Sequence, residues 1–230
     1  MTKLVDLSHP IRDGMTTHPG IPAPHITTFL SHEESAARYA PGTTFEITRI
    51  DLVANTGTYV DTPAHRFKGE ADLAGLDLEQ VAGIEGVLVD CRETSADGAE
   101  RGIRPERIER GLGGVGGVDP RGRAVLLRTG WDERWGIEAY LSDNPFLTAA
   151  GAAYLIDIGA AIIGIDSLNI DSLLDPTRPA HTAILRAGLP LVEHLTGLGA
   201  LPQSAWRFFA VPPRIEGMAT FPVRAFAIVE

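Results

Sequence analysis

The chain has very little cysteine: Cys91 is the only one in 230 residues. A single thiol excludes an intramolecular disulfide, and it permits a reducing compartment without proving one. Long apolar runs are also missing. Residues 1–6 contain no apolar leader core, and no stretch approaches the roughly 18 apolar residues of a membrane span. We therefore expect a cytoplasmic protein that does not interact with a membrane.

Positive charge is scarce as well, because 20 Lys and Arg stand against 30 Asp and Glu, for a net charge of −10. A nucleic-acid-binding protein needs a basic stripe to neutralise phosphates, so we expect no nucleic-acid partner. Hydrophobic residues make up 44% of the chain and charged residues 22%, which is ordinary for a globular protein. No linker or internal repeat divides the sequence, so residues 1–230 are expected to form one domain.

The order of elements predicts an α/β single domain with a mixed β-sheet. The first sixty residues are irregular and strand-rich, whereas strands and helices alternate in the second half. Strands are expected at residues 4–7, 45–53, 86–90, 124–128, 161–166 and 223–229. Helical segments are expected for about a turn from residue 63, and at residues 78–81, 105–110, 148–159 and 179–187.

The sequence supports neither a dinucleotide-binding motif nor a serine-hydrolase motif. Residues 111–117 formally contain G-x-G-x-x-G, but this stretch follows a helical pattern and leads to a strand, whereas a dinucleotide fingerprint follows a strand and opens a helix. It predicts a flexible loop. No G-x-S-x-G elbow occurs, which argues against a serine nucleophile. Ser167 and Asn169 follow a strand end and are expected to line a pocket.

The densest polar cluster lies at residues 55–66, where a predicted strand ends. Pro63 suits the first position of a helix and Thr62 its N-cap. Asp61 then stands just before the helix and His65 in its first turn, so both can point into the same space. This pair suits Zn²⁺ or Mn²⁺ by ligand type, although an Asp near a helix start is more often a cap and a lone His is more often a surface residue.

A second cluster combines a proline-opened helix with a carboxylate further along the chain. His181 lies near the start of the helix, and Glu193 closes an apolar, strand-like run. Glu193 is either committed to a partner or is a surface acid beside a surface histidine. The residues alone leave both alternatives open.

The sequence resembles the cyclase family that includes bacterial kynurenine formamidases and isatin hydrolases. That family carries H-x-G-T-H-x-D-x-P-x-H, and residues 55–65 read N-T-G-T-Y-V-D-T-P-A-H. Further landmarks follow in the family's order over nearly the whole chain. They are D-L-S-H-P-I at residues 6–11, P-G at 19–20, L-L-R-T-G-W at 126–131, G-I-D-S at 164–167, His181, L-P-L-V-E at 189–193, I-E-G at 215–217 and P-V-R at 222–224.

The resemblance implies a swivelling β/β/α cyclase-like fold, assembled as a homodimer or homotetramer with active sites near subunit contacts. It also implies that Asp61, His181 and Glu193 are metal ligands and that His65 is the acid/base residue. Two positions depart from the family, because Asn55 and Tyr59 replace metal-binding histidines. An amide oxygen binds metal weakly and a phenol must first lose a proton of pKa about 10.

These departures favour one divalent ion, Zn²⁺ or Mn²⁺, over two. Asn55 and Tyr59 are then free to bind the substrate. His18 stands where formamidases tend to carry an aromatic residue that stacks on the substrate, which indicates a different small-molecule substrate.

The predicted activity is hydrolysis of a non-peptide C–N bond, in an amide or a cyclic amide, by metal-activated water with His65 moving the proton. Lactone hydrolysis or ring closure in the same site is an alternative. A binding protein that has lost its metal is another, motivated by Asn55 and Tyr59. The joint presence of Asp61, His65, His181 and Glu193 argues against that last alternative.

Overall fold

A nine-stranded mixed sheet forms the body of the protein, whose computed structural model describes residues 2–92, 101–113 and 117–230. The strand order is β1-β13-β11-β5-β7-β9-β10-β4-β12. The run from β5 to β10 is parallel, and the strands on either side of it are antiparallel. The strands are β1 (Lys3–Asp6), β4 (Tyr59–Asp61), β5 (Ala82–Asp90), β7 (Ala124–Arg128), β9 (Ile162–Ile165), β10 (Leu191–Glu193), β11 (Trp206–Phe209), β12 (Thr220–Pro222) and β13 (Phe226–Val229).

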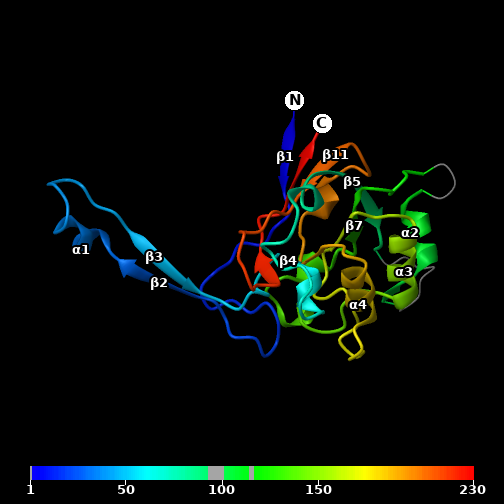
Figure 1. The fold of residues 1–230 in the computed structure, drawn as a ribbon, viewed down its shortest axis with the longest axis horizontal. Helices are drawn as coiled ribbons and strands as arrows, with labels where there is room; N and C mark the ends of the chain where they lie inside the picture. The colour runs from blue at the N-terminus through cyan, green and yellow to red at the C-terminus, as the bar shows by residue number, and fades with distance from the viewer. Residues whose placement is uncertain (1, 93–100, 114–116) are drawn as a thin grey trace.

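The predicted α/β class with a mixed sheet is confirmed, and the three short apolar runs form β5, β7 and β9 at its centre. Three helices, α2 (Pro105–Gly111), α3 (Ala149–Asp157) and α4 (Pro179–Arg186), cover one face of this centre (Figure 1). Their apolar faces bury Ile108, Leu155 and Ile184 against Val125 and Ile163 of the sheet. Burial on both faces explains why these strands are continuous apolar runs.

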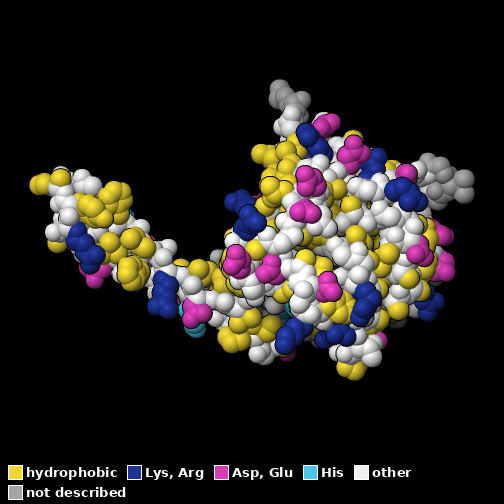
Figure 2. Space-filling model, viewed as in Figure 1, with side chains coloured by type: hydrophobic (Ala, Val, Ile, Leu, Met, Phe, Trp, Pro, Cys, Tyr) yellow, Lys and Arg dark blue, Asp and Glu magenta, His cyan; other side chains and the backbone are white. Residues whose placement is uncertain are grey.

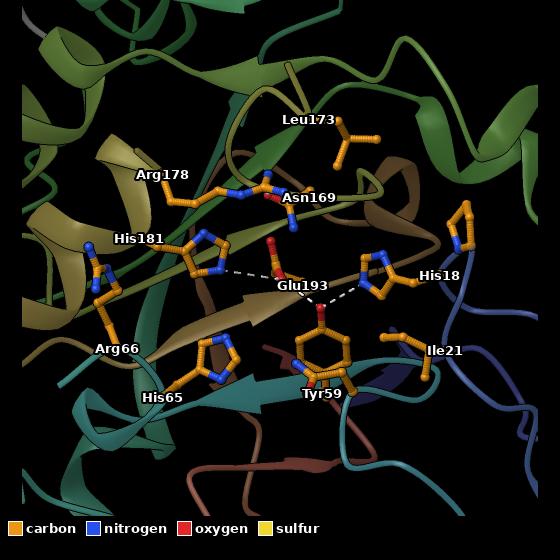
Figure 3. A pocket seen from close by; sticks show the side chains of 12 residues that line it. His18, Ile21, Tyr59, His65, Arg66, Asn169, Leu173, Arg178, His181 and Glu193 are labelled. Atoms are coloured by element: carbon orange, nitrogen blue, oxygen red, sulfur yellow. Dashed lines mark hydrogen bonds and ion pairs between the residues drawn. The ribbon is translucent and has the colours of Figure 1, made fainter. Parts of the chain in front are cut away.

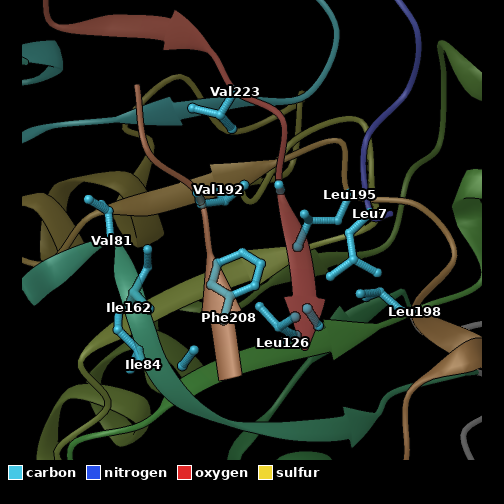
Figure 4. Packing of buried hydrophobic residues seen from close by; sticks show 14 of the residues in the cluster. Leu7, Val81, Ile84, Leu126, Ile162, Val192, Leu195, Leu198, Phe208 and Val223 are labelled. Carbon is cyan, nitrogen blue, oxygen red and sulfur yellow. The ribbon is translucent and has the colours of Figure 1, made fainter. Parts of the chain in front are cut away.

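A second core fills the other face of the sheet, around Phe208 of β11 (Figure 4). It joins side chains from distant places in the strand order, such as Val5 of β1 and Val60 of β4. The sheet must therefore curl around this core. The curl brings the antiparallel outer strands over the parallel centre, while the two chain ends lie side by side in β1 and β13.

A hairpin arm projects from the body (Figure 1). It consists of β2 (His25–Leu30) paired antiparallel with β3 (Ile47–Asp51), and α1 (His32–Ala36) lies near its tip. The expected strand at residues 45–53 is thus present, but it belongs to the arm and not to the main sheet. Hydrophobic side chains gather along the arm (Figure 2), and those of Phe29 and Phe45 are 70% and 53% exposed.

Short segments complete the fold. The 3-10 turns are η1 (Pro63–His65), η2 (Leu78–Gln80), η3 (Trp131–Arg134), η4 (Glu138–Tyr140) and η5 (Leu198–Ala200), and a small parallel pair joins β6 (Gly102–Ile103) to β8 (Phe146–Leu147). Thr62 occupies the N-cap of η1, but its hydroxyl donates to the carbonyl of Ala219 and makes no cap bond. Residues 114–116 of the expected glycine-rich loop lie outside the described residues. Of the helices described, none combines the length and the apolar character needed to cross a membrane.

Candidate metal centre and its pocket

Strand pairing places four polar side chains on one face of the sheet. β4 lies between β10 and β12, and the register sets Glu193 opposite Tyr59 and Thr220 opposite Asp61. Because alternate residues of a strand point to the same face, the Tyr59 and Asp61 side chains leave β4 together. All four side chains are 3% exposed or less. Polar groups buried this deeply need partners.

Helix α4 presents His181 to this face. Pro179 opens the helix, and the Asp171 carboxylate accepts the next two backbone N–H groups, from Ala180 at 2.6 Å and from His181 at 3.1 Å. The same carboxylate lies 2.7 Å from Nδ1 of His181. A carboxylate that accepts Nδ1–H fixes the ring and leaves Nε2 free to bind a metal ion.

Nε2 of His181 faces two carboxylates, those of Asp61 and Glu193, and Figure 3 shows its contact with Glu193. The nitrogen lies 3.8 Å from Oδ2 of Asp61 and 3.7 Å from Oε2 of Glu193. Two ligand atoms bound at about 2.1 Å in a tetrahedral site lie about 3.4 Å apart, so an ion fits between these atoms after small adjustments. Oδ2 of Asp61 is buried and has no hydrogen-bond partner among the described residues.

The charges at this position also favour a cation. Asp61, Asp171 and Glu193 are at most 1% exposed, and all three converge on one imidazole. Burial would lower the pKa of His181, but the charge of Glu193 and the hydrogen bonds to the carboxylates raise it well above its ordinary value. Burial would raise the pKa of Glu193, but His181 holds it below its usual range. Buried carboxylates in such excess are paired or coordinate metals.

His65 lies at the open side of the same cluster. Its Nδ1 is 3.0 Å from Oγ1 of Thr220, whose hydroxyl donates to Oδ1 of Asp61 at 2.5 Å. Because the single hydroxyl proton goes to the carboxylate, Oγ1 can only accept from His65, which places the imidazole proton on Nδ1. Nε2 of His65 then carries a lone pair, suited to take a proton or to bind an ion.

Ligand atoms of Asp61, His65 and His181 all lie within 4.8 Å of one another, so these three could hold a metal ion. The set predicted from the sequence shares Asp61 and His181 and adds Glu193, which is also in contact with His181. Both arrangements use residues that the fold brings together. The division of roles between His65 and Glu193 stays a prediction.

Tyr59 begins a row of hydrogen-bonding rings that leads away from the cluster. Its hydroxyl donates to Oε2 of Glu193 at 2.7 Å and lies 3.0 Å from Nε2 of His18. His194 follows at 3.1 Å, and the Tyr140 hydroxyl lies 2.8 Å beyond it. Burial, together with the nearby carboxylates, raises the pKa of Tyr59 well above its ordinary value, and burial lowers those of His18 and His194. Tyr59 is therefore a neutral phenol and a poor metal ligand.

A cavity of about 510 Å³ opens onto this cluster, and six of the seven predicted site residues line it. The seventh, Asp61, is fully buried beside them. A small molecule of the size of a substituted benzene fits a volume of this order. The lining residues are His18, Pro19, Ile21, Asn55, Tyr59, His65, Arg66, Asn169, Leu173, Arg178, His181 and Glu193. Asn169 is where it was expected, whereas the Ser167 hydroxyl is buried and donates to the carbonyl of Pro145.

Several residues of the site were missed in the sequence. Asp171 lies ten positions before His181 without a recognisable motif, and Thr220 reaches Asp61 only through the β4–β12 register. Arg178 immediately precedes the proline of α4 and could have been noted as a cation next to a candidate ligand. His194 was visible beside Glu193, but nothing indicated that it is buried.

Comparison with known proteins agrees with this architecture. The chain is 28% identical over 225 residues to a kynurenine formamidase of Polaromonas naphthalenivorans, covering 97% of this chain and 89% of the relative. It is 26% identical over 226 residues to a kynurenine formamidase of Maricaulis maris, covering 98% and 97%.

Solved structures show the same fold. Isatin hydrolase A from Labrenzia aggregata, bound to benzyl benzoate, superposes with a TM-score of 0.83 at 22% identity, over 99% of this chain and 94% of that one. A protein from Bacillus stearothermophilus, described as a predicted metal-dependent hydrolase, gives a TM-score of 0.75 at 24% identity over 100% of both chains. The family model described as a putative cyclase matches residues 5–172, and the chain therefore belongs to the cyclase family.

Proposed function

We propose that the protein is a metal-dependent hydrolase that cuts a non-peptide C–N bond in a small amide or cyclic amide. The curated relatives named kynurenine formamidase span almost the whole chain. The fold is shared with isatin hydrolases and with a protein described as a metal-dependent hydrolase. The observation that carries the proposal is the buried Oδ2 of Asp61, which has no hydrogen-bond partner in the part of the chain that the structure describes and faces Nε2 of His181 at the edge of a substrate-sized cavity.

One divalent ion, Zn²⁺ or Mn²⁺, would be held by Asp61, His181 and Glu193. Bound there, it would polarise a carbonyl and lower the pKa of water from 15.7 toward about 7. Asp171 holds Nδ1 of His181, which leaves Nε2 directed at Asp61 and Glu193, where the ion would be held. Neutral Tyr59 and Asn55 replace histidines of the family motif, which supports a single ion.

His65 would move the proton in this reaction. Its Nδ1–H is anchored on Thr220, so Nε2 can take a proton from water and return it to the leaving nitrogen. Such acid–base catalysis contributes about 10²–10⁴ in rate. Asn55 lines the cavity, and its amide can donate a hydrogen bond to the developing oxyanion. The one Tyr59 hydroxyl proton is donated to Glu193, so Tyr59 would position that carboxylate, and His18 lines the same cavity with Nε2 3.0 Å from the Tyr59 hydroxyl.

The test is a hydrolysis screen of N-formyl aromatic amines, cyclic amides and lactones, using protein reconstituted with Zn²⁺ or with Mn²⁺. We expect an amide to be the best substrate and His65→Ala to lose about 10²–10⁴ in kcat. His25→Ala changes a histidine of the exposed arm instead and serves as the matched control. If His65→Ala matched the parent on that substrate, the acid/base role would be refuted.

Metal content separates an enzyme from a binding protein. About one equivalent of ion per chain after reconstitution agrees with the proposal. Less than about a tenth of an equivalent, together with absence of turnover, would indicate a small-molecule-binding protein. A lactone as the best substrate would keep the site but change the bond that is cut.

We further propose that the protein is a homodimer or homotetramer assembled through the hairpin arm. A two-stranded hairpin is marginally stable by itself in water, and this one exposes Phe29, Ile47 and Ile50 by 70%, 47% and 49%. A second copy can bury these side chains. Light scattering should therefore give a multiple of 24.6 kDa, and Ile47→Ser with Ile50→Ser should shift the mass toward one chain. A monomeric parent would contradict the proposal.

A cytoplasmic location is proposed on one observation, the free thiol of Cys91 buried in the core. A reducing compartment keeps such a thiol reduced. Fractionation of the source cells with antibodies against the protein tests this, and recovery outside the cytoplasmic fraction would contradict it.

A further inference from the structure

Arg178 occupies an unusual position at the wall of the cavity. It immediately precedes α4, and its backbone is left-handed, with φ 50° and ψ 60°. A residue other than glycine in this region costs about 1–2 kcal/mol, and such strain is concentrated at functional sites. The side chain extends over the pocket toward Asn169 (Figure 3).

The guanidinium of Arg178 has no carboxylate partner within the described residues. Its Nη1 donates to two neutral oxygens, Oδ1 of Asn169 and the carbonyl of Ser172, both at 3.3 Å. The nearby acid Asp175 instead accepts hydrogen bonds from the backbone and hydroxyl of Thr177. Nε and Nη2 form no hydrogen bond within the described part of the chain, and they are the edge with which arginine binds carboxylates in a bidentate manner.

The charged residues of the pocket also favour an anionic ligand at Arg178. Asp61 is buried within the metal-site cluster, and the charged residues that line the cavity itself, histidines apart, are two arginines, Arg66 and Arg178, and one acid, Glu193. That acid is already committed to the Tyr59 hydroxyl and to the backbone N–H of Ile170. Hydrogen bonds from Thr177 lower the pKa of Asp175 and the nearby charge of Arg178 contributes, but the Asp175 carboxylate makes no ion pair with the guanidinium among the described residues. An anionic ligand would give the half-buried guanidinium a direct partner.

The positive charge of Arg178 affects a histidine on the other side of the cavity. Burial lowers the pKa of His18 on the opposite wall, and the positive charge of Arg178 contributes to the lowering. Apolar side chains of Ile21 and Leu173 also line the space. The pocket therefore offers an apolar surface for a ring and a cationic group at one side.

We propose that Arg178, with Asn169 beside it, binds a carboxylate carried by the substrate itself, apart from the bond that is cut. This deepens the proposed function and rests on it. Arg178 thus selects aromatic amides that bear a carboxylate over neutral ones of the same size. Arg66 is exposed and donates to the Thr182 hydroxyl, so it contributes only a screened charge at the entrance.

The experiment compares matched substrates that differ by one carboxylate. Formanilide is the neutral substrate, and the 2-, 3- and 4-formamidobenzoates are the acids, so that no position of the carboxylate is presupposed. The quantity measured is the ratio of kcat/KM for the best acid to that for formanilide. We expect Arg178→Gln to lower this ratio by about 10–100-fold, mainly through KM, because a hydrogen bond between charged groups is lost.

Two further variants separate charge, geometry and folding. Arg178→Lys keeps the charge without the planar fork and should give an intermediate ratio. Arg186→Gln removes an exposed arginine of α4 that contacts Phe67 and does not line the cavity, so it should keep the parent's ratio. Because the ratio uses two substrates on the same preparation, partial unfolding cancels.

The outcomes distinguish this inference from the proposed function. An unchanged ratio in Arg178→Gln, with hydrolysis in the parent, would overturn the carboxylate site and leave the hydrolase intact. If the parent hydrolysed nothing, the proposed function would fail, and titration calorimetry with anthranilate would decide. Binding at least 10-fold weaker in Arg178→Gln would support the carboxylate site, and equal binding would overturn it.

Discussion

Replacing Asp171 with asparagine should weaken the metal site without touching a ligand. The Asp171 carboxylate accepts three hydrogen bonds, from the N–H of Ala180 at 2.6 Å, the N–H of His181 at 3.1 Å and Nδ1 of His181 at 2.7 Å. In Asp171→Asn the amide oxygen can still accept one or two of them, but the NH₂ group must face at least one donor. One or two lost bonds at about 1–1.5 kcal/mol each predict a stability loss of about 1–3 kcal/mol.

The effect on the ion follows from the same contact. Without an acceptor for Nδ1–H, the ring of His181 loses the hydrogen bond that directs Nε2 at Asp61 and Glu193. Loss of such a carboxylate typically costs 10–100-fold in metal affinity, or about 1.4–2.7 kcal/mol. Zn²⁺ affinity is measured by competition with a chelating dye, and stability by urea unfolding of the metal-free protein.

Asp166→Asn is the matched control. Asp166 is equally buried and accepts from the N–H and hydroxyl of Thr129 and from the N–H of Gly130, but it does not contact the metal-site cluster. It should lower stability while Zn²⁺ affinity remains that of the parent. The reasoning would be refuted if folded Asp171→Asn bound Zn²⁺ as tightly as the parent, or if Asp166→Asn lost as much affinity.

Three further predictions concern pH, reactivity and packing. Burial lowers the pKa of His9 to about 4, so between pH 6.5 and 4 the unfolded chain binds a proton at His9 that the folded protein does not bind. The free energy of unfolding should therefore fall as the pH drops through this range. His9→Phe should reduce this loss by about 1–2 kcal/mol in urea titrations. An equally steep loss in that variant would contradict the assignment. Burial raises the pKa of Cys91 to about 12, so Ellman's reagent should modify it only after unfolding, and rapid modification of native protein would show the opposite. A Cβ at Gly86 would lie 1.8 Å from the Trp206 ring, so Gly86→Ala should lower the free energy of unfolding by about 3 kcal/mol or more, measured by thermal melts. Gly75→Ala is the control, because a Cβ there has no contact shorter than 3.7 Å and should change stability little. Equal melting temperatures of the two variants would refute the packing argument.

The centre of the fold was predictable because each buried strand is a local pattern. Strands β7 and β9 are short apolar runs bounded by turns, and burial on both faces leaves no other composition. The arm was not predictable in the same way. Ile47 and Ile50 suggest a half-buried strand, but both side chains are about half exposed because the hairpin leaves the body. Sequence periodicity cannot tell whether an apolar strand face is buried within the chain or exposed on a hairpin that leaves the body.

Within the site, too, residues brought together by a local turn were predictable, and residues brought together by distant strand pairing were not. Asp61 and His65 were recognisable because they lie four residues apart beside Pro63, so a local turn brings them together. Thr220 was not, because it meets Asp61 only through pairing of strands 159 positions apart. The expected capping bond of Thr62 failed for a related reason, since a distant backbone carbonyl took its hydroxyl.

We propose above all that Asp61 and His181 share a divalent ion in this pocket. Anomalous diffraction from crystals reconstituted with Zn²⁺ or Mn²⁺ tests it most directly. We predict one peak within about 2.0–2.6 Å of Oδ2 of Asp61 and Nε2 of His181. An ion bound elsewhere, or a structure at saturating metal with no peak between these two atoms, would contradict the account.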